Sequence, residues 1–157
     1  MDPEDDQLQT NQSIHLDGSH DSLSHDINWP VVLQNAGPYP REAFDFVREG
    51  LGFTVERIMV HAHAGGLHPT QSRHITGQQL SLGLRDFAFD RYGMLAPAVL
   101  RHWNILRTED FGRIVYALIE AGVMSKSDED SFDDFAGVYD FDEAFAPEVL
   151  SRRLCRG

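Results

Sequence analysis

The chain has 157 residues, a hydrophobic fraction of 41% and a formal net charge of −12 at pH 7. This length and apolar content fit one domain with a packed core, and the acidic excess argues against nucleic-acid binding through a broad basic surface. Because no run of residues is apolar for long enough to span a membrane, we expect no membrane association and a cytoplasmic location.

The first segment, residues 1–26, consists mostly of Asp, Gln, Ser, Asn and His, with isolated aliphatic side chains. Residues 1–40 contain seven acidic side chains and no Lys or Arg. Such a segment cannot bury enough apolar surface to offset the entropy lost on ordering, so we expect a disordered acidic N-terminal tail over 1–26. We expect a helical domain over 27–149 and a frayed basic end over 150–157.

Two helices are predicted at the start of this domain. Asn28 can cap a short helix that Gly37 ends. Apolar side chains then recur at helical spacing and predict a longer helix over 41–60, with one buried face. They are Phe44, Val47, Leu51, Val55 and Ile58. Gly50 and Gly52 each weaken that helix by about 1 kcal/mol relative to Ala, which indicates close packing or a bend.

A loop rich in Gly and His is predicted over 61–74. Thr76 and Gln79 have the spacing of a capping box, and they predict the start of a helix that Gly93 ends. A short helix follows, because Pro97 suits the first turn of a helix.

The most clearly delimited helix of the chain follows Asn104, a predicted left-handed C-cap residue. Thr108 occupies the expected N-cap position and Gly122 the expected stop, while Glu109 and Asp110 place negative charge at the helix start. One face carries apolar residues at helical spacing. They are Phe111, Ile114, Val115, Leu118 and Ile119.

A sixth, acidic helix is predicted from the capping-box-like spacing of Ser127 and Asp130, with Phe132 and Phe135 both facing inward. Three later apolar residues are expected to lie over the core: Phe141, Phe145 and Val149. No alternating strand pattern is longer than four residues. The predicted fold is therefore all-α, a single compact domain of five to six short helices.

The first candidate site consists of four histidines in the predicted loop, His61, His63, His68 and His74. Imidazole nitrogens bind zinc-like divalent ions, which prefer four ligands. The H-x-H start of the set converges only on extended backbone, where alternate side chains point the same way. Because no H-E-x-x-H or paired C-x-x-C accompanies these histidines, a solvated loop is the alternative interpretation.

The second candidate site is formed by Arg73 and Thr76 at the predicted helix start. An anion or a partner's carboxylate could bind the free backbone N–H groups there, held in place by Arg73. The alternative is that the neighbouring His74 caps or packs locally.

Several groups of residues carry a resemblance that covers about 39–145. They are Arg73-His74-Ile75-Thr76-Gly77, Trp103, Arg107-Thr108-Glu109-Asp110-Phe111-Gly112 and Tyr139-Asp140-Phe141. In these residues the chain resembles a small family of uncharacterised bacterial proteins. The resemblance implies one domain, and it implies no chemistry because no activity, cofactor or catalytic residue is assigned to that family.

The chain contains no G-x-S-x-G, P-loop or G-x-G-x-x-G motif that would indicate an enzyme. We therefore expect a non-enzymatic helical protein-interaction module of unknown partner, with homo-oligomer formation as one form of that interaction. The alternative is a metal-binding protein or metal-dependent enzyme that uses the histidines of the 61–74 loop and a zinc-like ion.

Overall fold

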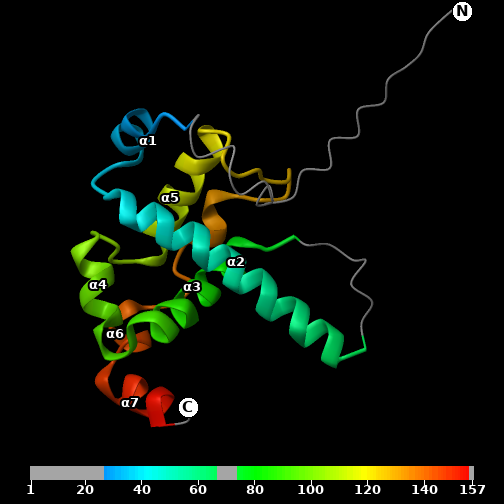
Figure 1. The fold of residues 1–157 in the computed structure, drawn as a ribbon, viewed down its shortest axis with the longest axis vertical. Helices are drawn as coiled ribbons and strands as arrows, with labels where there is room; N and C mark the ends of the chain where they lie inside the picture. The colour runs from blue at the N-terminus through cyan, green and yellow to red at the C-terminus, as the bar shows by residue number, and fades with distance from the viewer. Residues whose placement is uncertain (1–26, 67–73, 156–157) are drawn as a thin grey trace, which may run out of the picture.

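The structure is a computed structural model that describes residues 27–66 and 74–155. Within these ranges the elements are helices without a β-strand, which confirms the all-α prediction. In chain order they are α1 (Trp29–Ala36), α2 (Arg41–Ala64), α3 (Gly77–Tyr92), η1 (Gly93–Leu95), α4 (Ala96–His102), α5 (Thr108–Glu120), η2 (Phe132–Phe135), α6 (Phe141–Ala144) and α7 (Pro147–Cys155) (Figure 1). The predicted disordered tail over 1–26 lies outside the described residues.

The packing of α2 against α3 is the most extensive contact between two elements in the described chain. Two glycines allow the helices to approach closely. A Cβ atom at Gly83 would overlap the Thr54 side chain, and one at Gly50 would overlap Leu84. The buried Thr54 hydroxyl donates to the Gly50 carbonyl oxygen over 2.7 Å. The close packing that we predicted at Gly50 is therefore confirmed.

The centre of the core is supplied by α5, which contacts α1, α2 and α3. Its predicted apolar face is confirmed, because the first four residues are wholly buried and Ile119 is partly buried. The predicted N-cap is wrong by one residue, since Arg107 is the cap and Thr108 begins the helix. The buried Thr108 hydroxyl donates to the Phe135 carbonyl oxygen over 2.6 Å and accepts the Val138 N–H over 3.2 Å. It thereby ties the start of α5 to the segment after η2.

The other helix ends that we predicted from local chemistry are mostly confirmed. The Asn28 side chain caps α1, and Thr76 and Gln79 form the capping box of α3. Asn104 has a left-handed φ of 61°, and Gly122 after α5 has a φ of 76°. Each of these signals acts within a few residues, so it does not depend on the tertiary fold.

The end of the predicted 41–60 helix is wrong, because α2 continues to Ala64. Ala62 and Ala64 are strong helix formers. The helix ends at its C-cap, Gly65, and Gly66 then has a left-handed φ of 74°. Part of the predicted loop is therefore helical, and residues 67–73 lie outside the described residues.

The predicted sixth helix is wrong, because the structure contains only the short 3-10 helix η2 in this region. Ser127 and Asp130 bond to each other within an isolated turn. The residues that cap η2 are Ser131 and Asp134. The acidic run offers the same Ser-x-x-Asp spacing twice, and the sequence does not show which copy begins a helical turn.

The register of η2 is set by Phe135, which is buried between α3 and α5. It fits there because both helices present a glycine: a Cβ atom at Gly77 or at Gly112 would lie 3.0 Å from Phe135 side-chain atoms. Phe132 is exposed and packs edge-on against Tyr116. The prediction that both phenylalanines face inward is therefore wrong for Phe132.

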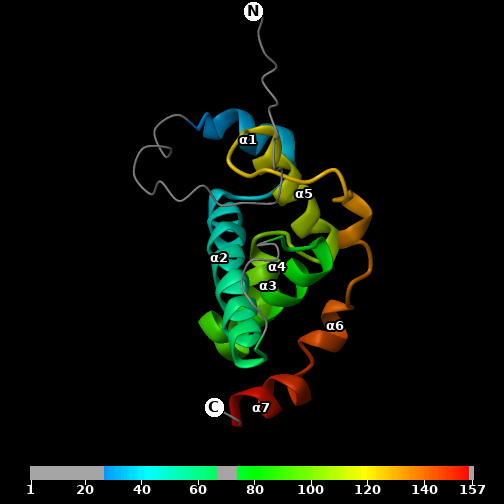
Figure 2. The same ribbon diagram turned by 90° about the vertical axis from the view of Figure 1, so that its right-hand side faces the viewer.

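The last two helices, α6 and α7, place the three later apolar residues against the core, as predicted. α7 continues to Cys155. Leu150 is buried, and Arg153 donates to Asp86 over 2.6 Å. Figure 2 shows α7 at the opposite end of the molecule from α1. In the described ranges, each helix is too short or too polar to traverse a lipid bilayer.

Replacing Gly83 with Ala is expected to lower the free energy of unfolding by about 1–3 kcal/mol, because the added methyl group overlaps Thr54 in a packed helix crossing. Urea unfolding followed by far-UV circular dichroism measures this change. Gln78→Ala, at an exposed position of the same helix, is the control and is expected to leave stability almost unchanged. Wild-type stability of Gly83→Ala would contradict the close approach of α2 and α3.

Candidate functional site

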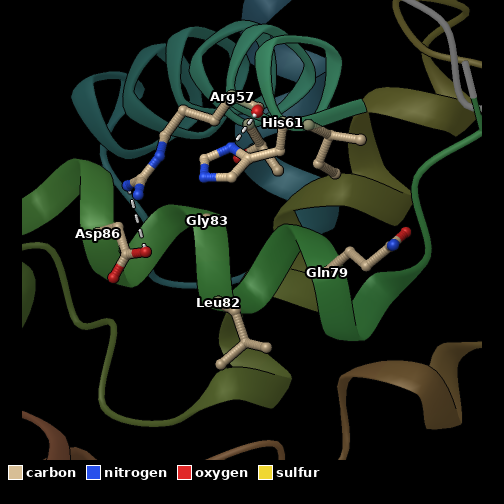
Figure 3. A pocket seen from close by; sticks show the side chains of 8 residues that line it. Arg57, His61, Gln79, Leu82, Gly83 and Asp86 are labelled. Carbon is tan, nitrogen blue, oxygen red and sulfur yellow. Dashed lines mark hydrogen bonds and ion pairs between the residues drawn. The ribbon is translucent and has the colours of Figure 1, made fainter. Parts of the chain in front are cut away.

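The candidate site is a groove between α2 and α3, with a cavity of about 360 Å³ (Figure 3). We call it the α2–α3 groove. The residues that line it are Thr54, Arg57, Ile58 and His61 from α2, and Gln79, Leu82, Gly83 and Asp86 from α3. In each helix the four positions have the spacing i, i+3, i+4, i+7, so each set forms one helical face. The groove therefore runs between one face of α2 and one face of α3.

Apolar surface is exposed within this groove. Ile58 and Leu82 are each 39% exposed, although both line the cavity. The sequence pattern placed Ile58 on the buried face of its helix, and this prediction is wrong. Leu51 and Thr54 are buried, and beyond them the groove residues Arg57, Ile58 and His61 mix polar and apolar side chains along one stripe of α2. That mixed stripe is the sequence signal that would have indicated a groove.

One end of the groove carries a cluster of charges centred on Asp86. Its Oδ1 atom accepts from Arg85 Nε over 3.1 Å and from Arg153 Nη1 over 2.6 Å, and its Oδ2 atom accepts from Arg57 Nη1 over 3.3 Å. The Arg57 guanidinium also lies over the Phe53 ring, 5.4 Å from its centroid. Three guanidinium groups therefore converge on one carboxylate, which leaves positive charge in excess at this end.

His61 is a second polar residue of α2 in the groove, after Arg57. Its exposed ring lies between α2 and α3, beside Gly83 (Figure 3). His61 Nδ1 lies 2.7 Å from the Arg57 carbonyl oxygen. Since a carbonyl oxygen only accepts, Nδ1 is the donor of this hydrogen bond.

The predicted metal ligands do not converge in the part of the chain that the structure describes. His61 and His63 lie two positions apart on α2, so their side chains diverge and the extended backbone that H-x-H ligation requires is not present. His74 Nε2 instead lies 3.1 Å from Asp130 Oδ1. Among the described residues no group of three or more His, Cys, Asp or Glu side chains could hold a metal ion. His68 lies outside those residues, and the four-histidine site stays a prediction.

The predicted anion site is also only partly described. Thr76 Oγ1 accepts the Gln79 N–H over 3.1 Å, and Gln79 Oε1 accepts the Thr76 N–H over 3.0 Å. This capping box already uses two of the donors that an anion at the start of α3 would need. Arg73 lies outside the described residues, so this site stays a prediction as well.

A second cavity, of about 520 Å³, adjoins a cluster of polar groups that are bonded to one another. Asp110 is buried there. Its Oδ1 atom accepts from the Tyr39 hydroxyl over 2.5 Å and from Arg113 Nη1 over 2.8 Å. Its Oδ2 atom accepts the Leu106 N–H over 2.8 Å and the Arg107 N–H over 3.0 Å. The lone pairs of the carboxylate are used by the protein itself, so we assign this cluster to stability and not to ligand binding.

Comparisons with known proteins leave the function to be inferred from this geometry. No protein-family model matches the chain, and neither a curated protein nor a solved structure matches it. The resemblance to a small family of uncharacterised bacterial proteins therefore stays a prediction.

The Tyr39 hydroxyl provides a test of the second cluster. Burial raises the pKa of Tyr39 to about 12; the hydrogen bond from Arg113 opposes this rise and the one to Asp110 adds to it. The neutral hydroxyl therefore contributes stability below the unfolded-state pKa of about 10, and this contribution is lost as the pH rises through 12.

We expect Tyr39→Phe to lower the free energy of unfolding at pH 8 by about 1.5–3 kcal/mol, because a buried hydrogen bond to a carboxylate is lost. The difference from wild type is expected to shrink as the pH is raised from about 10 to about 12. Denaturant unfolding of both proteins across this range measures it. A difference that stays constant would contradict the assignment of the raised pKa to this hydroxyl.

Proposed function

We propose that the protein is a helical protein-interaction module whose α2–α3 groove binds an amphipathic helix of a partner protein. The observation that carries the proposal is the exposed apolar pair, Ile58 and Leu82, within a cavity between two packed helices. A partner helix in this groove would pack a ridge of its own side chains between the groove-lining faces of α2 and α3. Helices pack in this way in bundles and in helix-in-groove recognition.

The dimensions of the groove set the expected length of the partner helix. Positions i to i+7 on each helix cover about 10 Å, or two turns, at the 1.5 Å rise of an α-helix. A partner would therefore need about three turns, with apolar anchors three or four positions apart. Covering the exposed parts of Ile58 and Leu82 would contribute about 1–2 kcal/mol each. The expected complex is thus modest in affinity and reversible.

A peptide selection tests the proposal. Amphipathic helical peptides are selected against the immobilised full chain, and their affinities are measured by fluorescence anisotropy. Ile58→Asp and Leu82→Asp are each expected to weaken binding of the selected peptides at least about tenfold, because each places a charge where an apolar anchor must pack. Circular dichroism melting checks that both variants remain folded.

Val60→Asp is the matched control, because Val60 lies on the same helix, is 61% exposed and does not line the groove. Its affinity for the selected peptides is expected to equal that of wild type. Peptides that are insensitive to both groove variants, or equally sensitive to Val60→Asp, would contradict the proposal.

Native mass spectrometry of the same proteins tests the expected homo-oligomer. A dimer that dissociates when the groove is changed would identify a second copy, and not a different protein, as the occupant.

A further inference from the structure

We infer that the α2–α3 groove selects a partner helix that carries a carboxylate one turn from its apolar anchors, and that Arg57 exchanges its pairing with Asp86 for that carboxylate. This inference rests on the proposed function and names the chemistry of the partner. It follows from the unequal way in which three arginines share Asp86.

The Arg57–Asp86 contact is the weakest of the three by distance and by exposure. Its 3.3 Å separation exceeds those of Arg85 and Arg153. The Arg57 side chain is 49% exposed, compared with 24% for Arg85 and 36% for Arg153. Of the three, only Arg57 lines the groove. Arg57 is therefore the guanidinium that can leave Asp86 and still reach a ligand in the groove.

The exchange costs little on the protein side. An ion pair with a half-exposed guanidinium contributes little to stability, because water screens it. Asp86 retains Arg85 and Arg153 on its other oxygen, so its charge stays compensated when Arg57 leaves. The Phe53 ring supports the Arg57 guanidinium independently of Asp86. A planar guanidinium matches a carboxylate with two parallel hydrogen bonds, which a single contact to Asp86 does not use.

The position of Arg57 among the groove residues sets the spacing that the partner must have. Arg57, Ile58 and His61 lie on one face of α2, with Ile58 between the two polar groups. A partner helix that covers Ile58 and Leu82 with aliphatic side chains therefore presents its neighbouring turn to Arg57. A carboxylate on that turn meets the guanidinium, with the His61 ring on the other side of Ile58.

Charge complementarity favours a separate partner over a second copy or the chain's own tail. Two copies repel each other, because each carries a net charge of −12. Residues 1–26 contain seven acidic side chains, but no two of their aliphatic residues are three or four positions apart. That segment therefore has acidic side chains for Arg57, but it lacks apolar residues at the helical spacing that contact with both α2 and α3 requires.

The test uses designed alanine-based helices of about 14 residues, long enough to cover the groove. Each carries two leucines four positions apart and either Glu, Gln or Lys one turn beyond them. We expect the Glu peptide to bind the full wild-type chain at least about tenfold more tightly than the Gln peptide. Arg57→Gln is expected to remove this preference, and Arg57→Glu to reverse it in favour of the Lys peptide. Arg85→Gln, which changes a partner of Asp86 outside the groove lining, is the matched control and should keep the wild-type preference.

Three results would overturn the inference. If the Glu and Gln peptides bind wild type equally and Leu82→Asp abolishes both, the groove is a docking site without carboxylate selection, and only the proposed function stands. If the preference for Glu survives Arg57→Gln, another group reads the carboxylate. If the free chain is a dimer that Arg57→Glu dissociates, or if cross-linking joins the groove to residues 1–26 of the same chain, the occupant is not a separate partner.

Discussion

The close crossing of α2 and α3 determines where the proposed site lies. Gly50 and Gly83 lack the Cβ atoms that would hold the two helices apart, and Thr54 fills the contact between them. Past this crossing, the C-terminal end of α2 extends away from the body of the molecule (Figure 1). One face of each helix is then left open toward the same cavity, and Arg57 comes within reach of Asp86. The apolar and the charged parts of the groove are both consequences of this one packing contact.

The rest of the fold holds that crossing in place from two directions. α5 is tied to Tyr39, two residues before α2, by the Tyr39–Asp110 hydrogen bond, and to the last residue of η2 by the bond from Thr108 to the Phe135 carbonyl oxygen. From the other end, Arg153 of α7 binds the same Asp86 carboxylate that Arg57 binds. The C-terminal helix is thus linked directly to the charged end of the groove. Because Asp86 keeps this link when Arg57 leaves, ligand binding and the packing of α7 need not compete.

Sequence patterns predicted those features that depend on neighbouring residues. The capping residues of α1 and α3, the left-handed Asn104 and the buried face of α5 each follow from local chemistry and one helical period. The errors arose where distant contacts decide the outcome. Phe135, for example, fixes the register of η2 through two glycines in other helices.

The candidate site was predictable in only one of its residues. His61 belongs to both the predicted histidine set and the groove, but it lies there as part of a helix and not of a loop. Arg57 and Asp86 are 29 positions apart, so no local pattern pairs them. Ile58 has a spacing consistent with the buried face and is exposed only because the core ends before it. A groove between two helices is a property of their packing, which single-helix periodicity does not contain.

Hydrogen–deuterium exchange of the full chain, with and without a selected helical peptide, tests the central claim most directly. If the α2–α3 groove is the docking site, added protection is expected over 54–61 of α2 and 79–86 of α3, with little change in α1. Protection confined to η1 and α7, or spread evenly over the chain with none in the groove, would contradict the account.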